Sequence, residues 1–193
     1  MSPSKHRQSC RDCKHAFARL LAEAAGEVQE QHSLGLSTRI EDYRGLPLYD
    51  ALAAIHTALQ RHRGFTNFVM HGQLRGVDYF LPRQRVVVEF DESQHFTAPR
   101  RIALSLYPAD LALGFAAERW MSLCAELDRH DQTPPHRDEQ RAWLDTLRDF
   151  SAPLLCHGST VRVYAGDEVW CSLDPAQPGN VERFRRCYLP GVE

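Results

Sequence analysis

No segment of the chain is apolar enough to cross a bilayer, since a membrane helix needs about 18 consecutive apolar residues and no run of that kind occurs in the 193 residues. The polar, basic start from Met1 to His15 also lacks the apolar core of a secretory signal. We therefore expect a cytoplasmic protein with no membrane partner. In that compartment the six cysteines should be thiols or metal ligands rather than disulfides.

Several common catalytic signatures are missing as well. The sequence contains no glycine-rich phosphate loop, no Gly-x-Ser-x-Gly elbow and no dinucleotide-binding fingerprint. An excess of one charge is also absent, because 23 basic and 25 acidic residues leave a formal net charge of −2. This balance argues mildly against a protein that coats nucleic acid without specificity. It is compatible with a nuclease, which needs only one basic face.

The composition that remains is that of one globular domain. Hydrophobic residues make up 43% and charged residues 25% of the chain, which are ordinary values for a folded protein. We treat residues 1–193 as a single domain with a frayed polar start at residues 1–9. Prolines and glycines between residues 174 and 193 predict an irregular C-terminal tail.

Apolar periodicity predicts an α/β or α+β layered domain. The order of elements is α-α-β-β-β-α-α-β, and the strand before Asp91 is apolar enough to be covered on both faces. The predicted helices are Cys10–Gln31, Pro47–Arg63, Ala98–Cys124 (interrupted near Pro108) and Asp138–Phe150; the predicted strands are Phe65–His71, Leu74–Leu81, Arg85–Asp91 and Thr160–Tyr164, with a candidate returning strand at Glu168–Ser172.

Acidic residues gather on two neighbouring predicted strands. Because side chains alternate faces along a strand, Glu89 and Asp91 project to the same face, and Asp78 can join them from the strand before. Like charges at short range raise one another's pKa unless a cation neutralises them, and Mg²⁺ or Mn²⁺ does so with oxygen ligands. A metal site built from Asp78, Glu89 and Asp91 is therefore predicted. Each acid taken alone is more commonly a solvated strand-end carboxylate.

His95 follows Asp91 by four residues, where the strand should end. An imidazole there could act as a general acid or base, or could orient a water molecule. Together with a metal ion that polarises a phosphodiester, these residues predict phosphodiester hydrolysis.

The same residues resemble the very-short-patch-repair-like branch of the PD-(D/E)XK nucleases. The second strand of that branch typically reads Val-Glu-x-Asp-Gly-x-x-His, and this chain has Val88-Glu89-Phe90-Asp91-Glu92-Ser93-Gln94-His95. The match places Asp78 and Glu89 on the first and second acids of the family. It places Asp91 in the position that other branches fill with lysine, and His95 on the histidine of the branch.

Downstream residues extend this resemblance. Asp138-Glu139-Gln140-Arg141 and the later Val161-Arg162-Val163 look like the Asp-x-x-Arg helix of the family and the strand that follows it. The resemblance implies a restriction-endonuclease-like three-layer core, with a central mixed sheet flanked by helices. It also implies a Mg²⁺-dependent endonuclease that hydrolyses DNA, in which Arg141 holds the acids or contacts phosphate. An acid from the first helix often joins such sites, and Glu23 and Glu27 are the candidates, although a solvated helix face is the simpler reading.

Departures from the branch keep a second function open. Glu92 stands where glycine is usual, the lysine is absent, and residues 111–137 look like an insertion that contains a helix at about Leu111–Leu127. The alternative is a catalytically inactive nuclease-fold protein that acts as a nucleic-acid-binding or protein-interaction module, with or without a structural zinc.

Two further groups of residues could bind ligands. Cys10 and Cys13 have the spacing of half a zinc site, which His6, His15, Cys171 or Cys187 could complete if the chain ends meet. An isolated pair of this kind is a weak signal. Arginines that flank the acidic strand could contact phosphate, or could form a solvated basic rim; they are Arg83, Arg85, Arg100 and Arg101.

Overall fold

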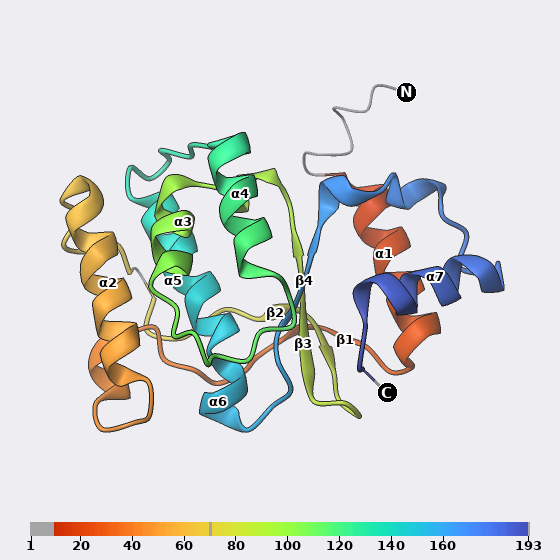
Figure 1. The fold of residues 1–193 in the computed structure, drawn as a ribbon, viewed down its shortest axis with the longest axis horizontal. Helices are drawn as coiled ribbons and strands as arrows, with labels where there is room; N and C mark the ends of the chain where they lie inside the picture. Colours follow the sequence, from red (N-terminus) through yellow and green to blue (C-terminus); the bar gives the residue numbers. More distant parts are fainter. Residues whose placement is uncertain (1–9, 70, 193) are drawn as a thin grey trace.

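The computed structural model describes residues 10–69 and 71–192, so the predicted frayed start at residues 1–9 lies outside the described residues. Within them, the chain forms seven α-helices and one mixed four-stranded sheet (Figure 1). No helix of the described part is both long and apolar enough to cross a membrane. The elements are α1 (Arg11–Ala25), β1 (Gln29–His32), α2 (Tyr49–Arg63), β2 (Val77–Leu81), β3 (Val86–Asp91), α3 (Ala98–Ser105), α4 (Ala117–Leu127), α5 (Arg137–Asp149), α6 (Ser151–Leu155), β4 (Val161–Tyr164) and α7 (Pro178–Tyr188).

The sheet has the order β1-β2-β3-β4. Strands β1, β2 and β3 form an antiparallel meander, and β4 pairs with β3 in parallel. All six residues of β3 are buried, as expected for a central strand covered on both faces. The predicted central acidic strand and the strand at Thr160–Tyr164 are therefore confirmed.

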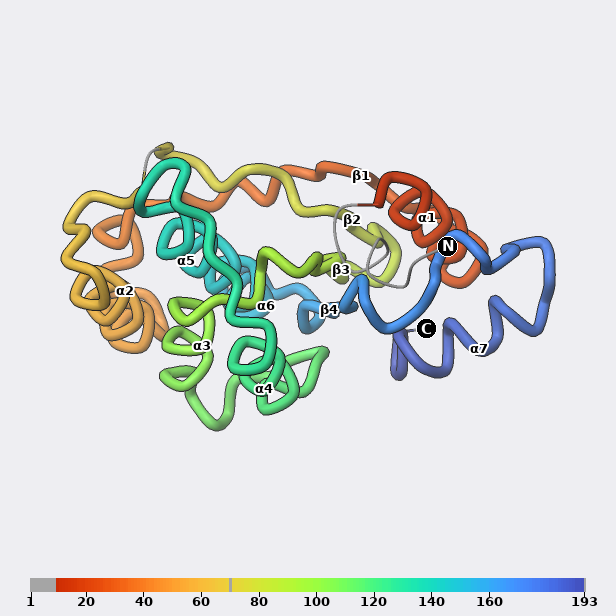
Figure 2. Tube along the Cα trace, turned by 90° about the horizontal axis from the view of Figure 1, so that it is seen from above, coloured from red at the N-terminus to blue at the C-terminus, as the bar shows by residue number. Residues whose placement is uncertain are grey.

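Helices cover both faces of the sheet (Figures 1 and 2). On one face, α1 and α7 lie side by side, and Phe17 of α1 contacts Phe90 of β3 and Phe184 of α7. On the other face, α3 packs against α4 and α5, and α2 lies outside them. The coarse α/β class with a mixed sheet between helical layers is thus confirmed.

The C-terminal tail is helical, which corrects the prediction of an irregular tail. Helix α7 begins at Pro178, and proline is well tolerated in the first turn because the backbone N–H that it lacks would be unpaired there anyway. Its Phe184 is buried against Phe17 and Trp170. Contacts with α1, which is distant from α7 in the sequence, thus stabilise the apolar face of α7.

Other predicted elements also differ in the structure. The helix predicted at Ala98–Cys124 is divided into α3 and α4, and the strand predicted from Leu74 begins at Val77. Residues 65–69 and 71 form no strand, and Phe68 instead packs from a loop against His56 of α2. The segment expected to return as a strand forms a 3-10 helix at Trp170–Ser172. The first helix ends at Ala25, where Gly26 adopts a positive φ of 87°, and the polar strand β1 follows. β1 has no apolar alternation, so only its pairing with β2 reveals it.

Candidate active site

Asp78 and Glu89 meet where strands β2 and β3 separate. The ladder between these strands joins Tyr79–Leu81 with Val86–Val88. Just beyond it, the Glu89 carboxylate accepts the Asp78 backbone N–H at 3.1 Å, and the Asp78 carboxylate accepts the Phe90 N–H at 3.1 Å. The two acids therefore replace backbone partners of the opposite strand, and this reciprocal bonding holds them next to each other as the sequence predicts.

A cation lies against each member of this pair. Lys14 of α1 places its Nζ 2.7 Å from Asp78 Oδ1, and Arg148 of α5 places its Nε 3.4 Å from Glu89 Oε1. Neither cation was among the predicted site residues. Lys14 is 64 residues from Asp78 in the sequence, so only the packing of α1 on the sheet shows that the Lys14 side chain reaches Asp78.

Burial makes Glu89 unusually basic for a carboxylate. Desolvation raises the pKa of Glu89 to about 7, the Arg148 charge opposes that rise, and the neighbouring Asp78 charge adds to it. A carboxyl group with this pKa exchanges its proton near neutral pH, as general acids and bases do. Perturbed groups of this kind are enriched at functional sites, which makes Glu89 the most informative residue of the pair.

Asp91 belongs to a different group, which corrects the prediction of a three-carboxylate cluster. Its side chain points to the same face as Glu89, as predicted, but Oδ1 lies 2.7 Å from Arg162 Nη1 and Oδ2 accepts the Trp120 indole N–H at 2.7 Å. Among residues 10–69 and 71–192, no three His, Cys, Asp or Glu side chains are arranged to hold a metal ion. Asp78 and Glu89 are thus the two acids brought together.

The partner of Asp91 is a buried arginine of β4. Arg162 also places its Nε 2.6 Å from Asp149 Oδ1 and its Nη2 3.6 Å from Asp145 Oδ1. Arg100 of α3 lies 2.6 Å from the other oxygen of Asp149. Arg100 is thus part of the core, and the expectation that it flanks the acidic strand as a phosphate contact or solvated rim is wrong. A buried network of charges links β3, β4, α3 and α5.

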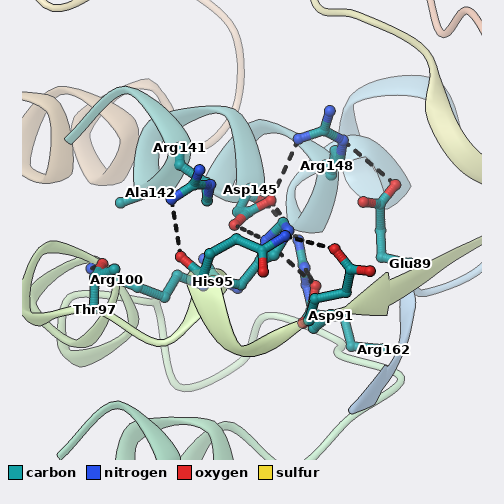
Figure 3. Close-up of polar contacts among 12 residues, drawn as sticks. Glu89, Asp91, His95, Thr97, Arg100, Arg141, Ala142, Asp145, Arg148 and Arg162 are labelled. Atoms are coloured by element: carbon teal, nitrogen blue, oxygen red, sulfur yellow. Dashed lines mark hydrogen bonds and ion pairs between the residues drawn. The ribbon is translucent and has the colours of Figure 1, made fainter. Parts of the chain in front are cut away.

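His95 joins this network from the 3-10 helix Ser93–His95, and its side chain is partly exposed (Figure 3). Its Nδ1 lies 2.9 Å from Asp145 Oδ2 and 3.6 Å from Asp91 Oδ1. Burial lowers the pKa of His95, but the Asp145 charge and hydrogen bond outweigh that effect, so the pKa is raised above its ordinary value. The structure therefore brings His95 to Asp91, as predicted, and pairs it with Asp145.

Arg141 lies near His95 rather than at the acid pair. Its Nη1 donates to the Gln94 carbonyl at 2.9 Å, and its Nη2 lies 3.0 Å from Asp131 Oδ2. Arg148 contacts both halves of the site, because its Nη1 lies 3.3 Å from Asp145 Oδ1 while its Nε faces Glu89 (Figure 3). Arg148, and not Arg141, is therefore the arginine of α5 that contacts the Asp78–Glu89 pair.

The indole hydrogen bond to Asp91 should be a measurable part of the stability. Trp120→Phe keeps an aromatic ring but removes a donor to a buried carboxylate, and hydrogen bonds to charged groups contribute about 1.5–3 kcal/mol. We expect the free energy of unfolding in urea to fall by about 2 kcal/mol.

Trp143→Phe is the matched control for this substitution. Trp143 is equally buried, but its indole N–H donates to the neutral Thr38 carbonyl at 2.8 Å. We expect a smaller loss than for Trp120→Phe. Equal losses in the two variants would show that the charge of Asp91 does not strengthen the bond.

The predicted zinc half-site lies where α1 packs against the 3-10 helix Trp170–Ser172. The Cys13 thiol is buried and contacts the thiols of Cys10 and Cys171, and burial raises its pKa to about 12. Cys171 is therefore the nearby member of the candidate ligands, but within the described ranges no three ligand-type side chains form a metal-holding group. His6 lies outside the described residues. Glu23 is exposed on α1, in line with a solvated helix face, whereas the exposed Glu27 lies beyond the end of that helix.

Comparisons with protein-family models, with curated proteins and with solved structures found no match to this chain. What the structure itself defines is an α/β protein whose mixed sheet carries a pair of carboxylates, the buried Glu89 and the partly exposed Asp78, beside two cations.

Proposed function

We propose that this chain is a metal-dependent endonuclease that hydrolyses phosphodiester bonds in DNA. The observation that carries the proposal is the Asp78–Glu89 pair, held between Lys14 and Arg148 at 2.7 and 3.4 Å. Two acids next to cations that can face phosphate form an arrangement suited to phosphoryl chemistry. The resemblance around Asp78, Glu89 and His95 supports this choice of reaction and of DNA as the substrate.

The donor set of the pair fits Mg²⁺ or Mn²⁺. Protein sites for Mg²⁺ commonly use only one or two carboxylates and complete the shell with water and substrate phosphate. Asp78 and Glu89 supply two such carboxylates, and the raised pKa of Glu89 shows that negative charge there lacks sufficient stabilisation. A bound divalent ion would supply Lewis-acid polarisation of the phosphodiester. Asp91 is paired with Arg162, so we assign it a supporting role in place of ligation.

The residues of the chain divide the remaining work. Lys14 neutralises Asp78 and can face an oxygen of the phosphate. In this role Lys14 would replace the lysine that is absent from the sequence motif. Arg148 is placed to stabilise negative charge that develops on the phosphate, because a guanidinium binds two oxygens at once. His95 lies 2.9 Å from Asp145, Arg141 donates to the carbonyl of the neighbouring Gln94, and we assign both residues a supporting role. We propose the restriction-endonuclease-like arrangement as the fold, in line with helices on both faces of a mixed sheet.

A cleavage assay tests the function directly. We expect the parent protein to cut plasmid and oligonucleotide DNA with Mg²⁺ or Mn²⁺, and Glu89→Gln to lower the rate by a factor of about 10² or more, the size expected when an electrostatic catalytic group is lost. Lys14→Met should also reduce the rate, because it removes a cation from the pair.

Glu126→Gln is the control, since Glu126 is an exposed acid of α4. It should cut DNA at the parental rate. Equal cleavage by the parent and Glu89→Gln, or no cleavage by the parent with either metal, would end the catalytic assignment.

One feature favours a second candidate, a non-catalytic nucleic-acid-binding module. Both acids already have a cationic partner in the chain, so their charge is partly neutralised without a metal. A module of this kind would bind DNA in a gel-shift experiment and leave it intact. It would also bind equally well in EDTA and in Mg²⁺.

A further inference from the structure

A pocket with basic walls lies beside the candidate active site. Its volume is about 170 Å³, and we call it the cationic pocket. Arg148 belongs to both places, because it lines the pocket while its Nε faces Glu89. The basic residues of the pocket are His71, Arg75, His95, Arg137, Arg141 and Arg148.

Helix α5 supplies one wall of the cationic pocket. Arg137, Arg141 and Arg148 recur at intervals of four and seven residues, so they lie on one side of the helix. The other basic lining residues come from the segment before β2, with His71 and Arg75, and from the 3-10 helix Ser93–His95. The fold thus directs basic groups from three separate segments toward one small space.

The arginines of α5 are held in place before any ligand binds. Arg141 is fixed by the Gln94 carbonyl and by Asp131 at 2.9 and 3.0 Å, and Arg137 donates to the Gln140 side chain at 3.1 Å. Arg148 Nε is buried and makes no hydrogen bond to any described residue. Fixed guanidinium groups lose little freedom on binding an anion, which favours tight binding.

Arg75 is the least neutralised of these groups. Its Nη2 contacts His71 Nε2 at 3.0 Å, and among the described residues no carboxylate forms an ion pair with it. By contrast, Arg137, Arg141 and Arg148 each have an acidic neighbour. Arg75 would therefore contribute the most binding free energy to an anion that enters the pocket.

We propose that the cationic pocket binds the terminal phosphate of a DNA strand, so that the enzyme acts on DNA that carries a nick or an end. This identification of the strand rests on the proposed function. A terminal phosphomonoester carries about −1.5 to −2 charges near neutral pH and has three acceptor oxygens, which suits a small pocket lined by basic groups from three segments of the chain. A phosphate inside a strand carries one charge, and its two ester links need two exits.

Binding of short duplexes in EDTA tests the proposal without cleavage. The probes are otherwise identical fluorescent duplexes that end in a 5′-phosphate, a 3′-phosphate or a hydroxyl, and the measurement is fluorescence anisotropy at fixed salt. We expect one phosphorylated end to bind at least about tenfold more tightly than the hydroxyl end. Arg75→Gln and Arg137→Gln should each remove most of this preference.

Arg44→Gln is the matched control, because Arg44 is an exposed arginine outside the pocket. It should keep the full preference. Equal affinity for phosphate and hydroxyl ends would overturn the proposal, as would the same loss of preference in Arg44→Gln. Inorganic phosphate is the second probe. If it competes as strongly as the phosphorylated duplex, the pocket takes the free ion and the assignment to a strand end is wrong.

The same experiment separates this proposal from the nuclease assignment. A protein that selects phosphorylated ends in EDTA but cuts no DNA with Mg²⁺ would support the proposed role of the pocket and refute the proposed reaction. A protein that cuts DNA with no preference among ends would support the proposed reaction and refute the proposed role of the pocket.

Discussion

Arg162→Met should destabilise the protein by about 3–5 kcal/mol, the usual cost of removing one partner from a buried ion pair. The Arg162 side chain is fully buried and lies 2.7 Å from Asp91 and 2.6 Å from Asp149, with Asp145 at 3.6 Å. Methionine fills much of the same space but removes the arginine partner of Asp91 and one of the two arginines that contact Asp149. The expected result is a large fall in the urea midpoint, or failure to fold at 37 °C.

Arg119→Met is the control for this substitution. Arg119 also pairs with an aspartate, Asp167, but its own side chain is 48% exposed, and pairs that water reaches contribute at most about 1 kcal/mol. We expect a loss of that size or less. If Arg162→Met were as stable as Arg119→Met, the network around Asp91 would contribute nothing beyond a surface pair, and its structural role would be refuted.

Glu89→Gln should raise the stability of the folded protein at pH 8, in addition to lowering the cleavage rate that we propose. The pKa of Glu89 is raised to about 7, so the folded state keeps a proton that the unfolded chain releases near pH 4.5. The stabilisation from that proton is complete below the unfolded pKa and is lost as pH rises through the folded pKa. Each unit of pKa shift corresponds to about 1.4 kcal/mol, which gives a loss on the order of 3 kcal/mol between pH 4.5 and 8.

Glutamine is neutral at every pH, so the variant should not show this loss. Melting curves of the parent and Glu89→Gln should nearly coincide at low pH and separate as pH rises through 7. For a protein of this size, the difference at pH 8 should be several degrees. A slope due to His95 should remain in the variant, because its raised pKa acts in the same direction.

Glu126→Gln is again the control, and its melting temperatures should follow those of the parent. If Glu89→Gln were the less stable protein at pH 8, the ion pair between Glu89 and Arg148 would outweigh the cost of burying the charge. The raised pKa of Glu89 would then be refuted, although a loss of cleavage would still support its catalytic role.

Local patterns were sufficient for the central part of the fold. The apolar run Val86–Val88 predicts a buried strand, and the alternation of side chains places Glu89 and Asp91 on one face. The helical periodicity of α2 and α5 likewise predicts those helices within a few residues. These features depend on neighbours in sequence, which is why they can be read without the tertiary structure.

Features that depend on distant contacts could not be read in this way. The polar strand β1 exists because its backbone pairs with β2, and α7 exists because Phe184 packs beneath α1. Residues 65–71 have the composition of a strand, but the described members form a loop because Phe68 packs on α2. In each case the packing partner decides the conformation.

For the candidate site, the sequence by itself determined that Asp78 and Glu89 would meet, since neighbouring strands bring them to the same point. Only the tertiary structure decided which cations they face and which acid is absent from the pair. Lys14 and Arg148 arrive from helices on opposite faces of the sheet, while Asp91 is taken by Arg162 of β4. A buried charge must find an opposite charge within a few ångströms, and that partner comes from wherever the fold places one.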